Sequence, residues 1–293
     1  MKILSLLLAL LSASLSPLFA QVKVEVALDQ EHFLVAEKLV VPVRITNRSG
    51  QTLRFGTEPD WLTFSIESRD GFIVAKNGEA PVVGDVGDFT LESGQVATRR
   101  VELTPYFALN RIGRYRVTAT VRLKQWDTQF TTKPASFDIV NGAKIWSQEF
   151  GVPAPAGESS RPPEVRRYTL EQANYLRSQL RLYLRLTNEG EAQVLKVFPL
   201  GPMVSFANPE RQIDRQSQLH VFFQNGARSF NYLVVSPDGD ILTRQTYDYA
   251  SSRPRLQLNE EGKVAVAGGA RRITTSDIPE PMPIETNVAT PKP

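Results

Sequence analysis

Apolar and polar side chains alternate strictly between residues 115 and 123 of this chain. Tyr115, Val117, Ala119, Val121 and Leu123 occupy every second position, and the residues between them are Arg or Thr. Because successive side chains of a strand point to opposite faces, this pattern predicts an antiparallel strand with one buried face. Eight further short runs, separated by turn residues, predict a two-sheet antiparallel sandwich. The nine predicted strands cover residues 22–26, 39–45, 53–55, 61–68, 72–75, 89–91, 96–103, 115–123 and 135–140.

The spacing of Asn110, Gly113, Tyr115 and Val117 resembles the tyrosine corner of immunoglobulin-like domains. The resemblance implies that Tyr115 lies at a sheet corner and that its hydroxyl bonds back to the preceding chain. It also implies that Val117 stands where the family has its second cysteine, and that Trp61 takes the place of the core tryptophan. We therefore expect an immunoglobulin-like β-sandwich over residues 21–150. The resemblance concerns the fold and implies no function.

Prolines and helix-capping residues separate this half of the chain from the next. Residues 151–167 contain four prolines and predict a semi-stiff linker. Thr169 and Gln172 then have the spacing of a capping box, with apolar residues at helical intervals up to Leu180. These signals predict a short helix at the start of a second domain, residues 168–272.

The second domain repeats a strand, turn and strand pattern. Leu182, Leu219 and Leu256 each begin a unit, and each follows the previous one by 37 residues. The units resemble the blade repeats of β-propellers, although the chain holds at most three and a propeller closes with about 4–8. The alternatives are an open β-meander packed on the helix and the first domain, a meander completed by another chain, and a small closed β domain with accidental periodicity. In every case the fold class is all-β.

The two ends of the chain have the composition of non-globular segments. Lys2 precedes a short apolar run, and Ala20 is a suitable cleavage residue, so residues 1–20 read as a signal peptide. The run is shorter than the about 20 apolar residues of a membrane span. An uncleaved anchor is the competing interpretation. Residues 273–293 contain five prolines and no periodicity, which predicts a disordered tail.

Composition narrows the classes of function. The chain has no cysteine, which excludes disulfides, thiolate zinc sites and cysteine nucleophiles. An exported chain without cysteine suggests a secreted or periplasmic protein of bacterial origin. The net charge is +3, but residues 161–272 carry an excess of five positive charges, and 14 of their 16 basic residues are Arg. This excess is too small to indicate nucleic-acid binding, whereas Arg suits carboxylate contacts and stacking on aromatic rings.

Few residues suit catalysis or metal binding. The two histidines, His32 and His220, fall in different predicted domains, so neither a triad nor a histidine metal site is supported. Asp238 and Asp240 flank Gly239 after a proline, which is typical of a tight turn and lacks the remainder of a calcium loop. We expect no metal and no cofactor.

One segment combines the residue types that are enriched in binding hot spots. Its members are Arg244, Tyr247, Tyr249, Arg253 and Arg255. The alternative is that the tyrosines pack on neighbouring strands and that the arginines are only solvated. Two functions therefore compete: an exported non-catalytic binding or assembly module with a protein or glycan partner in the cell envelope, and a secreted or periplasmic enzyme or binding protein for glycans.

Overall fold

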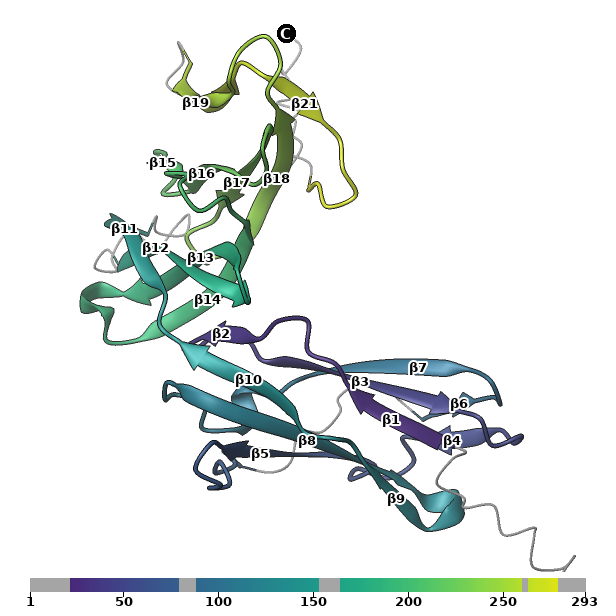
Figure 1. Cartoon of the computed structure of the whole chain (residues 1–293). Helices are drawn as coiled ribbons and strands as arrows, with labels where there is room; N and C mark the ends of the chain where they lie inside the picture. The colour runs from purple at the N-terminus through teal and green to yellow at the C-terminus, as the bar shows by residue number, and fades with distance from the viewer. Residues whose placement is uncertain (1–21, 79–87, 153–163, 260–262, 279–293) are drawn as a thin grey trace, which may run out of the picture. The chain divides into compact units, whose positions relative to one another are not determined.

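The computed structural model describes residues 22–78, 88–152, 164–259 and 263–278, and its regular structure is almost entirely β (Figure 1). In these residues the only helical elements are three single turns of 3-10 helix, so the predicted all-β class is confirmed. No helix in the described ranges is long and apolar enough to cross a membrane. The chain divides into two compact units, Met1–Asn141 and Gly142–Pro293.

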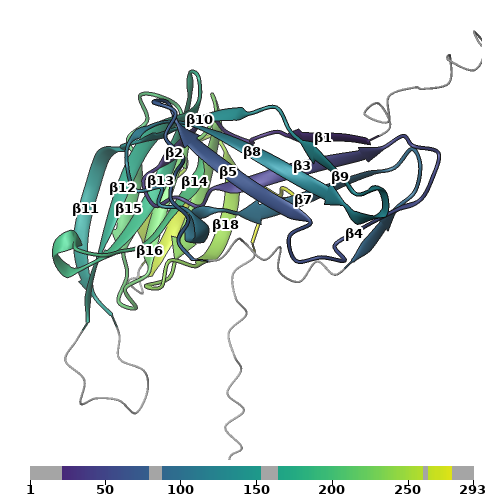
Figure 2. The same cartoon turned by 90° about the horizontal axis from the view of Figure 1, so that it is seen from below.

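Residues 22–78 and 88–141 of the first unit form two main sheets and a short strand pair. One sheet has the order β1 (Val22–Val26), β3 (Val40–Asn47), β7 (Val96–Glu102). The other has the order β2 (His32–Leu34), β10 (Ala135–Val140), β8 (Gly113–Leu123), β5 (Leu62–Ser68), and β9 (Thr128–Thr131) also pairs with β8. The pair consists of β4 (Leu53–Phe55) and β6 (Phe89–Leu91). Figure 2 shows β5 and β8 running side by side.

The alternating pattern of residues 115–123 determines which face of β8 is buried. Its apolar residues are all 6 % exposed or less and belong to one core, which β3 also enters through Val43 and Ile45. The hydroxyl of Tyr115 donates a hydrogen bond to the carbonyl of Arg111 at 2.8 Å, so it bonds back to the preceding chain as the resemblance to a tyrosine corner implies. Trp61 is buried against Phe55 and Phe89.

One predicted strand of this unit does not form. Residues 72–75 make only an isolated bridge, between Glu67 and Ile73. Phe72 and Ile73 are about three-quarters exposed, so neither side chain contributes the core face that a strand here would need.

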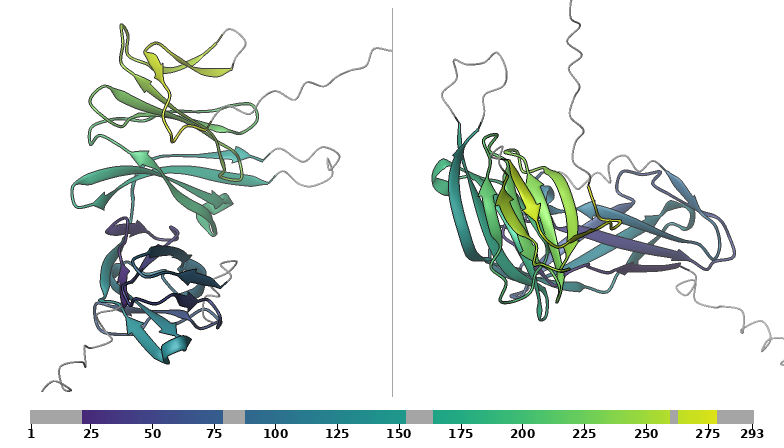
Figure 3. Two further views of the ribbon diagram at one scale, coloured as in Figure 1. Left: turned by 90° about the vertical axis from the view of Figure 1, so that its right-hand side faces the viewer. Right: turned by 90° about the horizontal axis from the view of Figure 1, so that it is seen from above.

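In its described residues, the second unit consists of three β layers (Figure 3). The first layer has the order β11 (Ala143–Gly151), β12 (Val165–Leu176), β13 (Gln179–Asn188), β14 (Val194–Pro202). The second has the order β15 (Glu210–Ile213), β16 (Leu219–Gln224), β17 (Ser229–Val235), β18 (Ile241–Asp248), β21 (Ala270–Arg272). The third is the hairpin β19 (Arg255–Leu258) and β20 (Val264–Ala267).

Two separate cores hold these layers together. Leu184 and Leu186 of the first layer share a core with Val221 and Leu233 of the second. On its other face, the second layer packs a smaller cluster against the hairpin; this cluster comprises Phe222, Phe230, Tyr232 and Val234 with the partly buried Leu242, Tyr247, Leu256 and Val266. A sheet covered on both faces has apolar residues at consecutive positions, which explains the nearly unbroken apolar sequences of β16 and β17.

The predicted short helix is wrong, because residues 165–176 form strand β12. Thr169 does not cap a helix; its hydroxyl lies 3.0 Å from that of Ser147 on β11. β12 pairs on one side with β11 and on the other with β13, with Leu170 opposite Leu184. The neighbouring strands thus satisfy its backbone, and burial of Tyr168 and Leu170 outweighs the local capping signal.

The proline-rich stretch predicted as a linker lies inside the second unit. Gly151 pairs with Val165, and the N–H of Val152 donates to the carbonyl of Glu164 at 2.8 Å. Residues 152–164 therefore connect the two strands of an antiparallel hairpin; of these, residues 153–163 lie outside the described structure. All of strand β11 except Gly151 falls in the range predicted for the first domain, 21–150, but the strand pairs with β12 of the second unit.

The three sequence repeats correspond to the three layers. Leu182 lies in β13, Leu219 in β16 and Leu256 in β19, and these strands belong to three different sheets. In the described residues the repeats are therefore stacked face to face, an arrangement that differs from propeller blades around an axis.

The two predicted terminal segments lie largely outside the described structure. This holds for the predicted signal peptide, residues 1–20, and for residues 279–293. The start of the predicted tail is ordered: Ile278 exchanges two backbone hydrogen bonds of 3.0 Å with Arg244 of β18.

Candidate binding surface

The five residues predicted to bind a partner are separated by the structure into two groups. Tyr249, Arg253 and Arg255 are exposed, and Tyr249 retains 42 % of its accessible surface. Arg244 and Tyr247 lie in β18 and are half-buried. The first group can contact a partner directly, whereas the second group takes part in packing.

Tyr247 packs mainly as a structural residue. Its ring lies edge-on to Phe222, with centroids 6.3 Å apart, and its hydroxyl donates to Gln245 at 2.8 Å. The guanidinium of Arg271 lies 5.7 Å from the centre of the ring. The alternative interpretation of the segment, in which the tyrosines pack on neighbouring strands, thus describes Tyr247 well.

Arg244 faces the main core of the unit. Its cross-strand partner is Leu233, a core residue, and directly paired side chains share a face. Burial lowers the pKa of the Arg244 guanidinium, although arginine still carries its charge at neutral pH. Its backbone also pairs with Ile278. Arg244 therefore belongs to the packing of the sheet.

Strand pairing brings three further arginines close to the exposed group of Tyr249, Arg253 and Arg255. Arg228 precedes β17, and its guanidinium lies 5.1 Å from the ring centre of Tyr249. Arg253 lies in the same way over Phe230, at 5.4 Å. β21 contributes Arg271 and Arg272 through its pairing with β18. We name this set the arginine–aromatic surface; its members are Arg228, Tyr249, Arg253, Arg255, Arg271 and Arg272.

The charge of the arginine–aromatic surface is unbalanced. Arg272 forms an ion pair with Asp248 and Arg271 with Asp277, both at 2.9 Å. The other three arginines, at positions 228, 253 and 255, form no ion pair with a carboxylate of the described residues. They are exposed, so their positive charges are available to a ligand.

The opposite end of the same sheet face holds a polar group that sequence reasoning missed. The Nδ1 atom of His220 lies 2.7 Å from the hydroxyl of Tyr232, and its Nε2 atom lies 3.2 Å from Asp214 Oδ2. His220 does alternate away from the main core, as the pattern of β16 indicates, but it is only 6 % exposed. A cavity of about 320 Å³ adjoins the group and is also lined by Thr243 and Lys263.

This group could have been found only through strand register. Tyr232 lies two residues before Val234, which is the cross-strand partner of His220, and Asp214 follows β15. With Asp214 accepting from Nε2–H, Nδ1 is left to accept from Tyr232, so the carboxylate holds the ring in one tautomer. The arrangement orients an imidazole beside a cavity.

The other polar candidates serve the fold. Asp238 pairs with Arg166 at 2.6 Å and Asp240 with Lys196 at 2.7 Å, so the turn at Gly239 fastens the second layer to the first. His32 lies in β2, 3.8 Å from Asp138. Within the described ranges, no three His, Cys, Asp or Glu residues are grouped so that they could hold a metal ion.

Comparison with known proteins gives little further information. No family model and no curated protein matches the chain. Among solved structures, it is similar to the sporulation control protein Spo0M from Bacillus subtilis, with 11 % identity and a TM-score of 0.27 over 61 % of this chain and 91 % of that one. A similarity this low carries no information about the function of the present chain.

Proposed function

We propose that this protein is an exported, non-catalytic binding module whose arginine–aromatic surface engages an acidic partner of the cell envelope. The observation that carries the proposal is the convergence of Arg228, Tyr249 and Arg253 from separate segments into stacked pairs at one end of a sheet. The apolar run and Ala20 near the N-terminus support export.

The chemistry of this surface indicates the ligand class. A guanidinium presents a planar fork of N–H donors that matches a carboxylate, and stacking on a ring holds that fork in place. Arg228 and Arg253 are held in this way and have no carboxylate of the described chain to neutralise them. Tyr249 adds a half-exposed ring, suited to the face of a sugar or an aromatic side chain. A carboxylate-bearing glycan satisfies both features.

We further infer that the first unit is an immunoglobulin-like sandwich that carries this binding unit. Two features support the inference. The hydroxyl of Tyr115 bonds to Arg111 four residues upstream, as in a tyrosine corner. The N-terminal strands also join different sheets, since β1 pairs with β3 whereas β2 pairs with β10.

The test is retention of the full chain on an immobilised acidic polysaccharide, with a neutral polysaccharide as reference. The double variant Tyr249→Ala, Arg253→Ala should bind the acidic polysaccharide more than about tenfold more weakly, equivalent to 1.4 kcal/mol. Both residues are exposed and belong to types enriched in hot spots. The melting temperature should change little. Tyr247 is left intact, since its contact with Phe222 would confuse binding with stability.

A stacked Arg–Tyr pair elsewhere in the unit is the matched control. Arg181 lies 3.6 Å from the ring centre of Tyr175, in the first layer. Replacing these two residues with Ala makes the same chemical change away from the arginine–aromatic surface and should leave retention unchanged. Equal retention of the wild type and the Tyr249→Ala, Arg253→Ala variant would refute the assignment of this surface.

The His220 group favours the second candidate function, an enzyme acting on envelope glycans. An oriented imidazole beside a cavity is one element of acid–base chemistry. Turnover of an envelope glycan that is abolished by His220→Gln, in a variant that still folds, would replace the non-catalytic assignment with this one.

A further inference from the structure

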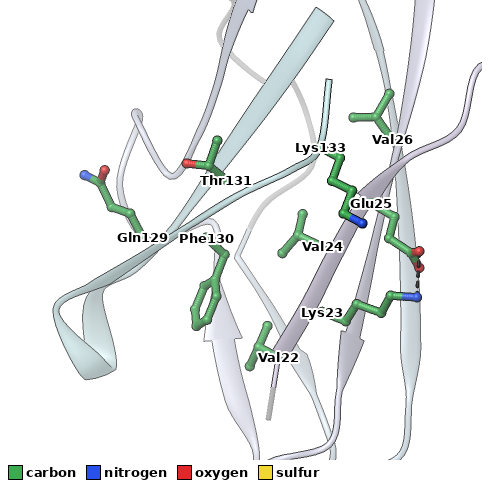
Figure 4. A pocket seen from close by; sticks show the side chains of 9 residues that line it. All are labelled: Val22, Lys23, Val24, Glu25, Val26, Gln129, Phe130, Thr131 and Lys133. Atoms are coloured by element: carbon green, nitrogen blue, oxygen red, sulfur yellow. Dashed lines mark ion pairs between the residues drawn. The ribbon is translucent and has the colours of Figure 1, made fainter. Parts of the chain in front are cut away.

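A groove runs between strands β1 and β9 of the first unit. It has a volume of about 730 Å³, and Val22, Val24, Val26 and Phe130 contribute its apolar lining. Figure 4 shows Val22 and Val24 pointing toward Phe130, while Lys23 and Glu25 point to the other side of β1 and form an ion pair. Val22, Val24, Val26 and Phe130 thus form an apolar strip in the groove, and its polar lining comes from Lys23, Glu25, Gln129, Thr131 and Lys133.

β1 also presents an unpaired backbone edge. Its neighbour on one side is β3, and the N–H of Ala27 donates to the carbonyl of Pro42 in that strand. The backbone N–H and C=O groups of successive residues point to opposite edges of a strand. Those of Lys23 and Glu25 therefore point toward β3, and those of Val22, Val24 and Val26 point outward, away from the sheet. No strand of the described structure pairs with this outward edge.

We propose that this edge binds the β1 edge of a second copy of the chain, antiparallel and centred on Val24. In this register Val24 lies opposite its own equivalent, and Val22 lies opposite the partner's Val26. The outward-facing N–H and C=O groups of the three valines then all find partners, as in the hydrogen-bonded pairs of an antiparallel sheet. The partner's valines fall on the same face and cover the groove. This proposal does not depend on the proposed function.

The charges of β1 select a second copy as the occupant. In the centred antiparallel register, Lys23 lies opposite the partner's Glu25, and Glu25 opposite the partner's Lys23. These are non-hydrogen-bonded pairs, in which opposing side chains are closest and opposite charges stabilise the sheet. Within one copy the two residues already attract each other, at 2.6 Å, and Lys23 lowers the pKa of the Glu25 carboxyl by a hydrogen bond. The sequence Val-Lys-Val-Glu-Val is thus complementary to itself.

The opposite edge of the same sheet lacks this property. β7 carries Arg99 at its centre and Arg100 beside it. Centred self-pairing would place Arg99 opposite its own equivalent, and like charges in direct opposition destabilise a sheet. Edge strands are commonly protected by charge, proline or bulges. β1 has no proline and pairs with β3 without a bulge, so it remains open to another strand.

The test is sedimentation velocity of the full exported chain over a range of concentrations. We expect a dimer for the wild type and a dissociation constant at least about tenfold higher for Lys23→Glu and for Glu25→Lys, because each places like charges opposite one another. An equimolar mixture of the two variants should form a heterodimer. The double variant Lys23→Glu, Glu25→Lys should dimerise like the wild type, since the exchange restores both pairs.

Two further variants separate pairing from folding. Val24→Pro removes an outward N–H at the centre of the register and leaves the β1–β3 ladder intact, so it should give a folded monomer. Lys38→Glu makes the same charge change at another exposed ion pair, with Glu102, and should not affect the dimer. A wild-type chain that remains monomeric at every concentration, or a dimer unaffected by the single charge reversals and by Val24→Pro, would overturn the proposal.

Discussion

Removing the hydroxyl of Tyr168 tests how the two main layers of the second unit are held together. Tyr168 lies in β12, is fully buried and stacks on Phe150 with ring centroids 4.0 Å apart. Its hydroxyl reaches into the second layer, 2.8 Å from the carbonyl of Ser236 and 3.1 Å from that of Ser217. Tyr168→Phe retains the stacked ring and removes only this polar link.

The stability that Tyr168→Phe loses depends on what happens to the two carbonyl groups, those of Ser236 and Ser217, that accept from the hydroxyl. The carbonyl of Ser236 also accepts the N–H of Gly239 at 2.9 Å, so it keeps a partner in the variant. The carbonyl of Ser217 loses the Tyr168 donor. An unsatisfied buried acceptor costs about 1–3 kcal/mol; because the hydrogen bond from Tyr168 to Ser217 is only partly buried, we expect a loss of about 1 kcal/mol. For a chain of this size each kcal/mol lowers the melting temperature by about 2–4 °C.

The burial of Tyr168 also predicts how the free energy of unfolding changes with pH in the alkaline range. Burial raises the pKa of its hydroxyl far above the ordinary value of 10.0. Below pH about 10 the hydroxyl is protonated in the folded and the unfolded chain, so its contribution is complete. Above that pH only the unfolded chain ionises, and stability falls by up to about 1.4 kcal/mol per pH unit until the folded pKa is reached. Tyr168→Phe should remove this part of the alkaline decline.

Denaturant unfolding at pH 7 and at a series of alkaline pH values measures both effects. Tyr175→Phe is the control, because Tyr175 lies in the same strand and its hydroxyl bonds to Gln179 in an exposed position. We expect this control to change stability by less than about 0.5 kcal/mol. If Tyr168→Phe cost no more than Tyr175→Phe, or left the alkaline profile unchanged, the hydroxyl would not link the layers.

Two further predictions concern the first unit and the hairpin of the second. Tyr115→Phe removes the bond to the Arg111 carbonyl and should cost about 1 kcal/mol in denaturant unfolding; an unchanged midpoint would contradict a role for this bond. Proteolysis confined to residues 153–163 should leave the two fragments together in native size-exclusion chromatography, because β11 stays paired with β12. Separation of the fragments would instead support an interdomain linker.

The sequence by itself determined the structure wherever the physical signal is local. The alternation from Tyr115 to Leu123 specifies a strand and its buried face, because the two faces differ in polarity at every step. The turn residues between short apolar runs specify the all-β class. The resemblance to a tyrosine corner implies that the Tyr115 hydroxyl bonds back to the preceding chain, and the structure gives the carbonyl of Arg111, four residues earlier, as the partner.

Only the tertiary structure decided between competing local signals. Residues 169–172 have a capping box, yet β11 and β13 supply hydrogen-bond partners on both sides, and burial of Leu170 favours the strand. The repeats starting at Leu182 and Leu219 predict strands correctly, but whether such units form a ring or stacked layers depends on which faces pack together. The packing of segments that are far apart in the chain leaves no periodic pattern of apolar residues in either segment, so the sequence does not predict it.

The same division applies to the candidate sites. Tyr249 and Arg253 stand out in the sequence, whereas Arg228 and Arg271 join them only through the pairing of β17 and β21 with β18. The self-complementary charges of β1 can be read from five residues, but only the sheet order leaves that strand at an edge. The sequence thus determined the chemistry that each strand carries, and the tertiary structure decided which strands are neighbours and which edge is open, because hydrogen bonds between strands join residues that are far apart in the chain.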